Sequence, residues 1–196
     1  EFLSLLRDRG LRKRYLVFGR ADFIANHPDL IRDFKALGLR TAIVGLESFD
    51  DLELEGYVKR SQAADNERAL KVLNANGVDC YAGVIVSPAW GHEDFALLRK
   101  TLAALSIKFI NLQPLTPLPG TGIEVDESRI IVDRKDYPRW DLANVTIRPE
   151  KMSLADYYRE IIKTYRAVLF APAHVFSHRK YSRSMQWRLA KGVWRV

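Results

Sequence analysis

Short apolar runs alternate with stretches of helical periodicity along the first 115 residues. Four runs have the length and composition of buried strands, at residues 15–19, 41–48, 79–88 and 107–115. The third run is apolar on both of its faces, which predicts a sheet covered on both sides. Between the runs, apolar residues recur at three- and four-residue spacing, which predicts helices over about 28–37, 63–76 and 95–102.

Helix boundaries are also written in the sequence. Asn26 is a candidate N-cap with Pro28 in the first turn, and Gly38 is a stop signal for that helix. Gly77 ends the second helical stretch in the same way. The resulting alternation, with strands starting roughly 25–40 residues apart, is the pattern of βα units in a parallel sheet. We therefore expect an α/β fold of about four βα units, either an open sheet or part of a barrel.

The alternation stops after residue 115. A Pro/Gly loop, TPLPGTG, occupies residues 116–122, and only residues 129–134 offer one more short strand. We expect the βα units to fill residues 1–125 and a mostly helical C-terminal extension to fill 126–196.

The extension contains one clear helix. Ser153 followed by Asp156 has the spacing of a capping box, and an apolar stripe continues to Pro172. This predicts a helix near 153–170, with the stripe packed into the core.

The net charge of +7 is concentrated at the C-terminus. Residues 174–196 contain six Lys or Arg and no Asp or Glu, which leaves a net charge of +1 for residues 1–173. The tail also contains Trp187 and Trp194. Three readings stay open: a helix packed on the body with a solvated basic face, contact with an anionic membrane surface, or nucleic-acid binding.

A single cysteine limits the chemistry of the chain. Cys80 excludes an internal disulfide and any Cys-only zinc or iron–sulfur site built from this chain alone, and we expect it to be inert core. His174 and His178 have metal-ligand spacing, but cations surround them and no carboxylate completes the set, so we expect no metal site. With no signal peptide and no apolar run of ~18 residues, we expect a cytoplasmic protein. Peripheral contact with a membrane through residues 174–196 is the alternative.

Polar residues follow the expected strands at their carboxyl ends. Arg20, Glu47, Trp90 and Gln113 stand at or just beyond these ends, where parallel α/β proteins bind ligands. This set suits a charged, polyhydroxylated, aromatic ligand. Glycine-rich dinucleotide, phosphate-loop and nucleophile-elbow motifs are absent.

An ordered series of segments resembles the radical S-adenosylmethionine (SAM) superfamily over roughly residues 10–170. The segments are GRADFI, HPDLI, FKALGLRTAIVGLES, VKRSQAADNERALKVLNANGV, GVIVSPAWGHEDF and LQPLTPLPGT. The stretch WDLANVTIRPEKMSLADYYREI is similar to the helical extension that follows the barrel in the cobalamin-binding branch. That branch includes the anaerobic magnesium-protoporphyrin ester cyclase and hopanoid-associated enzymes.

The resemblance implies a partial (β/α) barrel that holds SAM across its strand carboxyl ends, beside a [4Fe–4S] cluster that cleaves SAM to a radical. The family's C-x-x-x-C-x-x-C motif is absent, so the cluster ligands would lie outside this chain. We expect the chain to be the C-terminal part of a longer enzyme, inactive by itself and possessing neither the first βα units nor a cobalamin domain. A naturally degenerate relative is the alternative.

The resemblance also assigns roles to residues. Glu47 matches the residue that binds the SAM ribose hydroxyls, and Lys59 or Arg60 matches the cation that pairs with the SAM carboxylate. A purely structural role stays open for each, as a helix cap for Glu47 and as surface cations for the other two.

Further positions follow the same matching. Gly83, Val84 and Ile85 fall where the family packs adenine, and Gln113 joins the cofactor side of the cavity. Arg20 is expected to touch substrate or SAM, or to pair with Asp22 or Glu47 for stability. Trp90 is expected to be a substrate wall or to be loop packing.

The expected parent enzyme performs radical cyclisation, methylation or oxidation of an apolar or tetrapyrrole-like small molecule with SAM, a [4Fe–4S] cluster and cobalamin. The alternative is an α/β module that binds nucleic acid or protein through the basic tail. A dimer formed through an exposed sheet edge is a further expectation.

Overall fold

The computed structural model describes residues 1–49, 63–171, 183, 184 and 187. The chain forms two compact units. The sheet unit contains Glu1–Pro88 and Phe109–Arg148, and the helical unit contains Ala89–Lys108 and Pro149–Val196. The irregular segment before Arg148 belongs to the sheet unit, and the predicted domain boundary near residue 125 stays a prediction.

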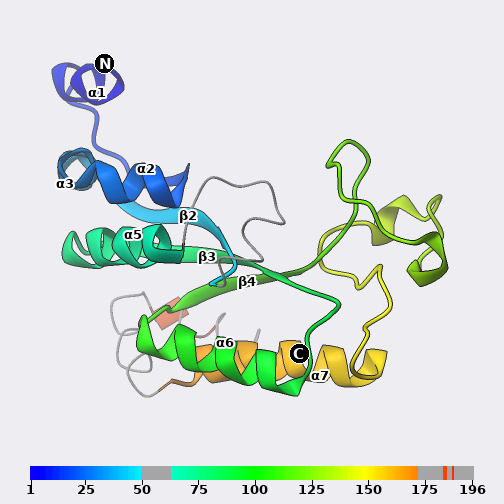
Figure 1. Ribbon diagram of the computed structural model, residues 1–196. Coiled ribbons are helices and arrows are strands. Elements are labelled where there is room, and N and C mark those ends of the chain that lie inside the picture. The colour runs from blue at the N-terminus through cyan, green and yellow to red at the C-terminus, as the bar shows by residue number, and fades with distance from the viewer. Residues whose placement is uncertain (50–62, 172–182, 185–186, 188–196) are drawn as a thin grey trace. The chain divides into compact units, whose positions relative to one another are not determined.

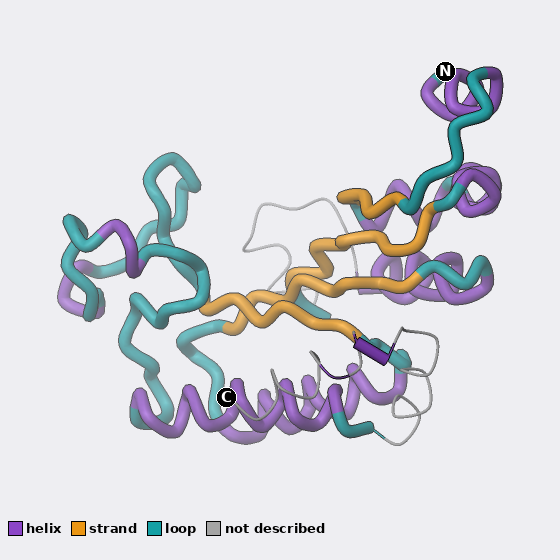
Figure 2. Tube along the Cα trace, turned by 180° about the vertical axis from the view of Figure 1, so that it is seen from behind, coloured by secondary structure: helices purple, strands orange, loops and turns teal. Residues whose placement is uncertain are grey.

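Four parallel strands form the sheet, in the order β1-β2-β3-β4 (Figures 1 and 2). They are β1 (Tyr15–Gly19), β2 (Leu39–Glu47), β3 (Asp79–Val86) and β4 (Phe109–Pro114). The predicted α/β fold with four parallel strands is confirmed, and each predicted strand overlaps an observed one. In the described residues, β1 and β4 are the two edges of this sheet.

Helices of the sheet unit pack against one another and against β2 and β3 (Figure 1). They are α1 (Phe2–Asp8), α2 (Ala21–Asn26), α3 (Pro28–Leu37) and α5 (Ala63–Ala75). The predicted cap at Asn26 is wrong, because Asn26 ends the short helix α2 and His27 precedes α3. Pro28 still occupies the first turn of α3, where its missing N–H costs no hydrogen bond.

Gly38 ends α3 in a conformation that only glycine accommodates there. Its φ is +118°, and a Cβ on this residue would lie 1.8 Å from the carbonyl oxygen of Lys13. The Gly38 carbonyl in turn accepts a hydrogen bond of 3.0 Å from the Tyr15 N–H at the start of β1. This glycine therefore fixes how the chain enters both β1 and β2.

The two faces of the sheet differ in exposure. Even-numbered side chains such as Val44, Ala82 and Leu112 are buried, whereas the alternate side chains of β2, β3 and β4 remain partly accessible. The expectation that the third strand is buried on both faces is wrong for the described residues, since its alternation is that of a strand with one open face. That open face carries the candidate site.

The segment after β4 is irregular, as predicted for most of its length. It contains two 3₁₀ turns, η1 (Glu127–Arg129) and η2 (Tyr137–Arg139). The strand predicted at 129–134 is reduced to one antiparallel bridge between Ile130 and Ile147.

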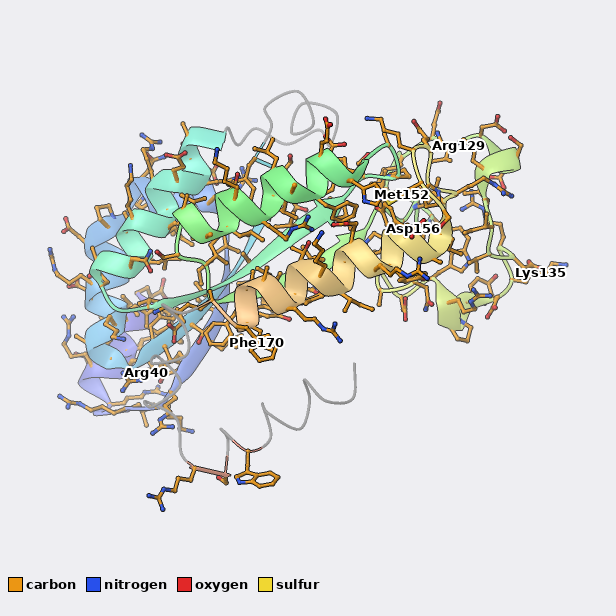
Figure 3. The ribbon with its side chains drawn as sticks, turned by 90° about the horizontal axis from the view of Figure 1, so that it is seen from below. Arg40, Arg129, Lys135, Met152, Asp156 and Phe170 are labelled. Atoms are coloured by element: carbon orange, nitrogen blue, oxygen red, sulfur yellow. The ribbon has the colours of Figure 1, made fainter. Side chains whose placement is uncertain are left out.

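The helical unit contains α6 (His92–Ala104) and α7 (Leu154–Leu169), which lie side by side (Figure 3). Phe95 of α6 meets Tyr157 of α7 edge-on, with ring centroids 5.3 Å apart. The predicted helix near 153–170 is confirmed, and Ser153 Oγ accepts a hydrogen bond of 3.1 Å from the Asp156 N–H. Asp156 is labelled in the first turn of α7 in Figure 3.

A buried carboxylate joins α6 to α7. Glu160 is 6% exposed, and its Oε2 accepts a 2.6 Å hydrogen bond from Arg99 Nη1. Its Oε1 lies 3.1 Å from His92 Nδ1 and 3.5 Å from Lys163 Nζ. Burial pushes the pKa of Glu160 upward, but the hydrogen bonds from Arg99 and His92 and the charges of Arg99 and Lys163 outweigh burial and leave the pKa below its ordinary value.

Candidate functional site

A hollow of about 600 Å³ lies on the open face of the sheet, at the carboxyl ends of the strands. Its volume is within the range of small-molecule sites. All of the described residues that line it belong to the sheet unit.

The register of the sheet explains the inner part of the hollow. Phe18, Ile43 and Tyr81 are partners across β1, β2 and β3, so their side chains share one face. They form an apolar row along one side of the hollow. Phe18 is 83% exposed, so the hollow opens toward solvent along β1.

Two glycines form the floor beside this row. Gly45 of β2 pairs with Gly83 of β3, and Asn111 of β4 pairs with Gly83. With no side chain at two adjacent positions, the backbone itself is the surface that a ligand would meet. Such a floor accommodates a flat ring lying against the sheet.

Glu47 stands at the end of β2 on a distorted backbone. The pairing of β2 with β3 shifts register between Gly45 and Glu47, and the φ of Glu47 is +60°. The Ser48 N–H donates a 2.7 Å hydrogen bond to the Leu46 carbonyl across it. An i to i+2 bond around a residue with positive φ is the rare, strained form of the γ-turn, and bulges of this kind re-aim a side chain. Here the re-aimed side chain lines the hollow.

Arg20 lies at the mouth of the hollow and is held by Asp22. Its Nε and Nη2 donate hydrogen bonds of 3.0 and 2.8 Å to the two carboxylate oxygens of Asp22. The hydrogen bond from Arg20 lowers the pKa of Asp22, and the same bond raises the pKa of Arg20. Of the partners considered for Arg20, Asp22 is the one observed.

A second hollow of about 390 Å³ adjoins the first and shares Phe18, Gly19, Arg20 and Asp22 with it. Its own wall includes Phe23 and His27, whose rings stack with centroids 4.1 Å apart. The two hollows together offer an apolar and aromatic surface beside a polar rim.

The structure brings four of the sequence-predicted residues to one place. Arg20, Glu47, Gly83 and Gln113 all line the larger hollow. Their predicted binding roles stay predictions, but the geometric requirement that they share one cavity is met.

Val84 and Ile85 are not among the residues that line the hollow. Val84 is 1% exposed and points to the opposite, buried face, so only its backbone is near the floor. Ile85 is on the open face by alternation but does not line the hollow. Trp90 belongs to the helical unit and packs edge-on against Phe95, which is the loop-packing alternative. Lys59 and Arg60 lie outside the described residues.

Sequence reasoning missed Gly45, Tyr81 and Ile43 as lining residues. The strand alternation through Glu47 and Gly83 was a sufficient signal for them, because residues two apart share a face.

The thiol of Cys80 is unsuited to metal binding. Its side chain is buried on the face opposite the hollow, and burial, with a smaller contribution from Asp79, raises the pKa of the thiol to about 12. Within the part of the chain that the structure describes, no three His, Cys, Asp or Glu side chains are grouped to hold a metal ion. With a single cysteine in its sequence, the chain cannot supply the several thiolates that hold an iron–sulfur cluster.

The basic tail lies largely outside the described residues. His174 and His178 are among those not described. Trp187 is described and is 67% exposed. Among the described residues, every helix is too short or too polar to traverse a bilayer.

No protein-family model matches the chain. The whole chain is similar to a curated protein, the hopanoid C-3 methylase of Methylococcus capsulatus, with 26% identity over 196 residues. The match covers 100% of this chain and 35% of that relative, so the chain spans about a third of its relative's length.

Two solved structures are similar with low scores. The cobalamin-dependent SAM radical enzyme OxsB, with aqua-cobalamin bound, matches 61% of this chain and 18% of its own at 18% identity and a TM-score of 0.44. The radical SAM methyltransferase TsrM from Kitasatospora setae, with cobalamin and a [4Fe–4S] cluster bound, matches 57% of this chain and 22% of its own at 16% identity and a TM-score of 0.46.

The sheet and its hollow define an α/β protein with an open hollow at the carboxyl ends of its parallel strands, which is where proteins of this class bind ligands. The match over the whole of this chain confirms the predicted resemblance to the hopanoid-associated enzymes, which the sequence analysis placed in the cobalamin-binding branch of the radical SAM superfamily.

Proposed function

We propose that this chain is the SAM-binding part of a cobalamin-dependent radical SAM enzyme. The observation that carries the proposal is the placement of Glu47, on its strained turn, at the edge of a hollow floored by Gly45 and Gly83. A carboxylate beside a flat, side-chain-free floor is complementary to a nucleoside, which presents two ribose hydroxyls next to a planar base.

The glycine floor provides a test of fit. A Cβ on Gly83 would sit 3.7 Å from the Gly45 Cα and from the Val44 carbonyl, which is ordinary contact, so the fold itself tolerates a side chain there. In the proposed complex, the adenine ring occupies the space that such a side chain would fill. The described residues therefore fit the nucleoside part of SAM.

Each polar residue of the hollow has a distinct task in this proposal. Glu47 accepts hydrogen bonds from the ribose hydroxyls and fixes the orientation of the sugar. The Asn111 and Gln113 amides offer donors and acceptors to the polar edge of the base. Arg20 offers a cation at the mouth, where its pairing with Asp22 sets its direction. SAM, when bound, supplies the reactive group.

The cluster and the cobalamin would depend on other parts of the protein. The chain contains one cysteine, and the three thiolates of a radical SAM cluster cannot come from it. We therefore propose that the isolated chain binds SAM without turning it over. Methyl transfer is the favoured reaction of the whole enzyme, supported by the methylase relative. Cyclisation and oxidation remain the other outcomes of the expected chemistry.

An apolar substrate is the proposed partner of the site. The row formed by Phe18, Ile43 and Tyr81 continues past the polar rim toward the aromatic wall of the second hollow. Such a surface favours an extended apolar or tetrapyrrole-like molecule over a small polar one.

The test is titration of SAM into the purified chain by isothermal calorimetry. Replacing Glu47→Gln removes a charged acceptor and should raise Kd roughly 10- to 100-fold. The matched control is Glu67→Gln, the same change at an exposed position on α5, which should leave Kd unchanged. Failure of the wild-type chain to bind SAM, or equal loss in both variants, would refute the proposal.

A further inference from the structure

The buried side-chain amide of Asn66 forms hydrogen bonds to the backbone on both sides of Glu47. Asn66, in the first turns of α5, is 0% exposed. Its Nδ2 donates two hydrogen bonds, each 2.9 Å long, to the carbonyl oxygens of Leu46 and Ser48. These two residues flank Glu47 directly.

The chemistry of the two acceptors fixes which way the amide points. Both partners are carbonyl oxygens, and only the NH₂ group of Asn66 can donate to them. The reverse orientation would place three oxygens together with no proton between them. The assignment therefore follows from the network itself.

The two bonds hold a strained part of the backbone. Glu47 has a φ of +60°, a region that residues with a Cβ seldom adopt, inside a turn closed by the Ser48 N–H and the Leu46 carbonyl. Asn66 holds both ends of this turn, so it opposes relaxation of Glu47 to an extended conformation. Relaxation would swing the carboxylate away from its place at the rim.

Packing of α5 against the sheet does not by itself explain why residue 66 is an asparagine. Ala69, Leu70 and Leu73 are buried on α5 and already supply apolar contact. The Oδ1 atom of Asn66 has no hydrogen-bond partner among the described residues, and a buried amide oxygen in that state is unfavourable. An apolar residue would be better at this position if its only role were to pack α5 against the sheet. An amide NH₂ group, in contrast, can donate one hydrogen bond to each of the two carbonyl oxygens.

We propose that Asn66 is a positioning residue, which holds Glu47 in its left-handed turn and so aims the carboxylate at the ribose of the bound nucleoside. The inference rests on the proposed SAM site. It couples that site to α5, whose first turns thereby set the geometry of a ligand contact on the other face of the sheet.

A double-mutant cycle on SAM affinity tests the coupling. Asn66→Ala should weaken SAM binding roughly 10-fold in the wild-type background, and less than about 2-fold when Glu47→Gln is already present. The matched control is Asn76→Ala. This change removes the 2.8 Å hydrogen bond from Asn76 Nδ2 to the Val72 carbonyl at the far end of α5, and SAM affinity should stay unchanged. Equal losses from Asn66→Ala in both backgrounds, or no loss in either, would overturn the proposal.

A second cycle needs no ligand and separates this inference from the proposed function. Asn66→Ala should lower Tm by roughly 3–6 °C when residue 47 is Glu, and by clearly more in a Glu47→Gly background, because releasing the turn relieves backbone strain only when residue 47 carries a Cβ. Identical shifts in Tm would show that Asn66 does not act through the turn. If SAM fails to bind the wild-type chain but this coupling is found, the proposed function is refuted. The inference that Asn66 holds the turn at Glu47 is then still supported.

Discussion

Gly45 of β2 and Gly83 of β3 are register partners, and neither places a side chain on the open face of the sheet. Asn111 continues the same row on β4, and Glu47 stands two residues beyond Gly45 at the end of β2. Because the two glycines have no side chains, a planar group can lie directly against the backbone of β2 and β3 at this point. Because the pairing involves residues 38 positions apart in sequence, it is a property of the sheet and of neither strand alone.

A methyl group on this floor should separate binding from folding. Gly83→Ala adds a Cβ with only ordinary 3.7 Å contacts to protein atoms, so Tm should stay within a few degrees of wild type. The same methyl group occupies the floor, and we expect SAM affinity to fall at least ~5-fold, with Gly83→Val losing more. Calorimetry and thermal melting measure the two quantities on the same samples. A loss of affinity that merely follows a loss of Tm would count against the floor.

The helix end at Gly38 should be the least tolerant glycine of the sheet unit. Gly38→Ala combines a φ of +118° with a clash at 1.8 Å to the Lys13 carbonyl, and we expect a loss of at least ~3 kcal/mol in the free energy of unfolding. Gly10 is the control, because its φ of +62° is also positive but a Cβ there meets nothing within 4 Å. Gly10→Ala should cost only about 1 kcal/mol. Urea titrations of both variants decide the matter, and similar losses would contradict the steric argument.

Stability in acid should depend on Glu160. Since its pKa is lower in the folded chain than in the unfolded chain, ionised Glu160 favours folding at pH values above its ordinary pKa. That contribution is lost as pH falls through the ordinary value of 4.5 toward the lowered one. Glu160→Gln should therefore be less stable than wild type at pH 7, and the difference should shrink by pH 3.

The measurement is the free energy of unfolding of both proteins from pH 7 to pH 3. Other carboxylates titrate in the same range, so the informative quantity is the difference between variant and wild type. Glu93→Gln, an exposed change on α6, is the control and should give a difference that is small at every pH. A constant difference for Glu160→Gln would show that its charge is not what matters.

The thiol of Cys80 should be inert until the sheet opens. Burial raises its pKa to about 12, so almost no thiolate exists at pH 8. We expect a thiol-reactive disulfide reagent to modify the folded chain at least ~100-fold more slowly than the chain in denaturant. Rapid labelling of the folded chain would show that the buried face of β3 is accessible.

Much of the fold could be predicted from local signals. The apolar runs predicted all four strands, and the capping pair Ser153 and Asp156 predicted where α7 begins. Gly38 was predicted as a helix end because it is a glycine, and its observed φ of +118° explains why a glycine is needed there. These features depend on residues that are neighbours in the chain, which is why a single sequence reveals them.

The candidate site could be predicted only in part. Arg20, Glu47 and Gln113 were found because parallel strands bring their carboxyl ends to one edge. Trp90 follows a strand in the same way, yet it packs on Phe95 within the helical unit. Ile43 and Tyr81 line the hollow from positions inside their strands, so closeness to a strand end is not a requirement for lining it.

By itself, the sequence determined the strands, the order in which they follow one another and the polar residues at their ends, since periodicity and turn-forming residues act over a few positions. Tertiary structure alone decided that Gly45 meets Gly83, that Glu47 adopts a positive φ, and that Asn66 secures the turn from 20 positions away. Glutamate carries no intrinsic preference for a left-handed turn. Its conformation results from hydrogen bonds that exist only after α5 has packed against the sheet.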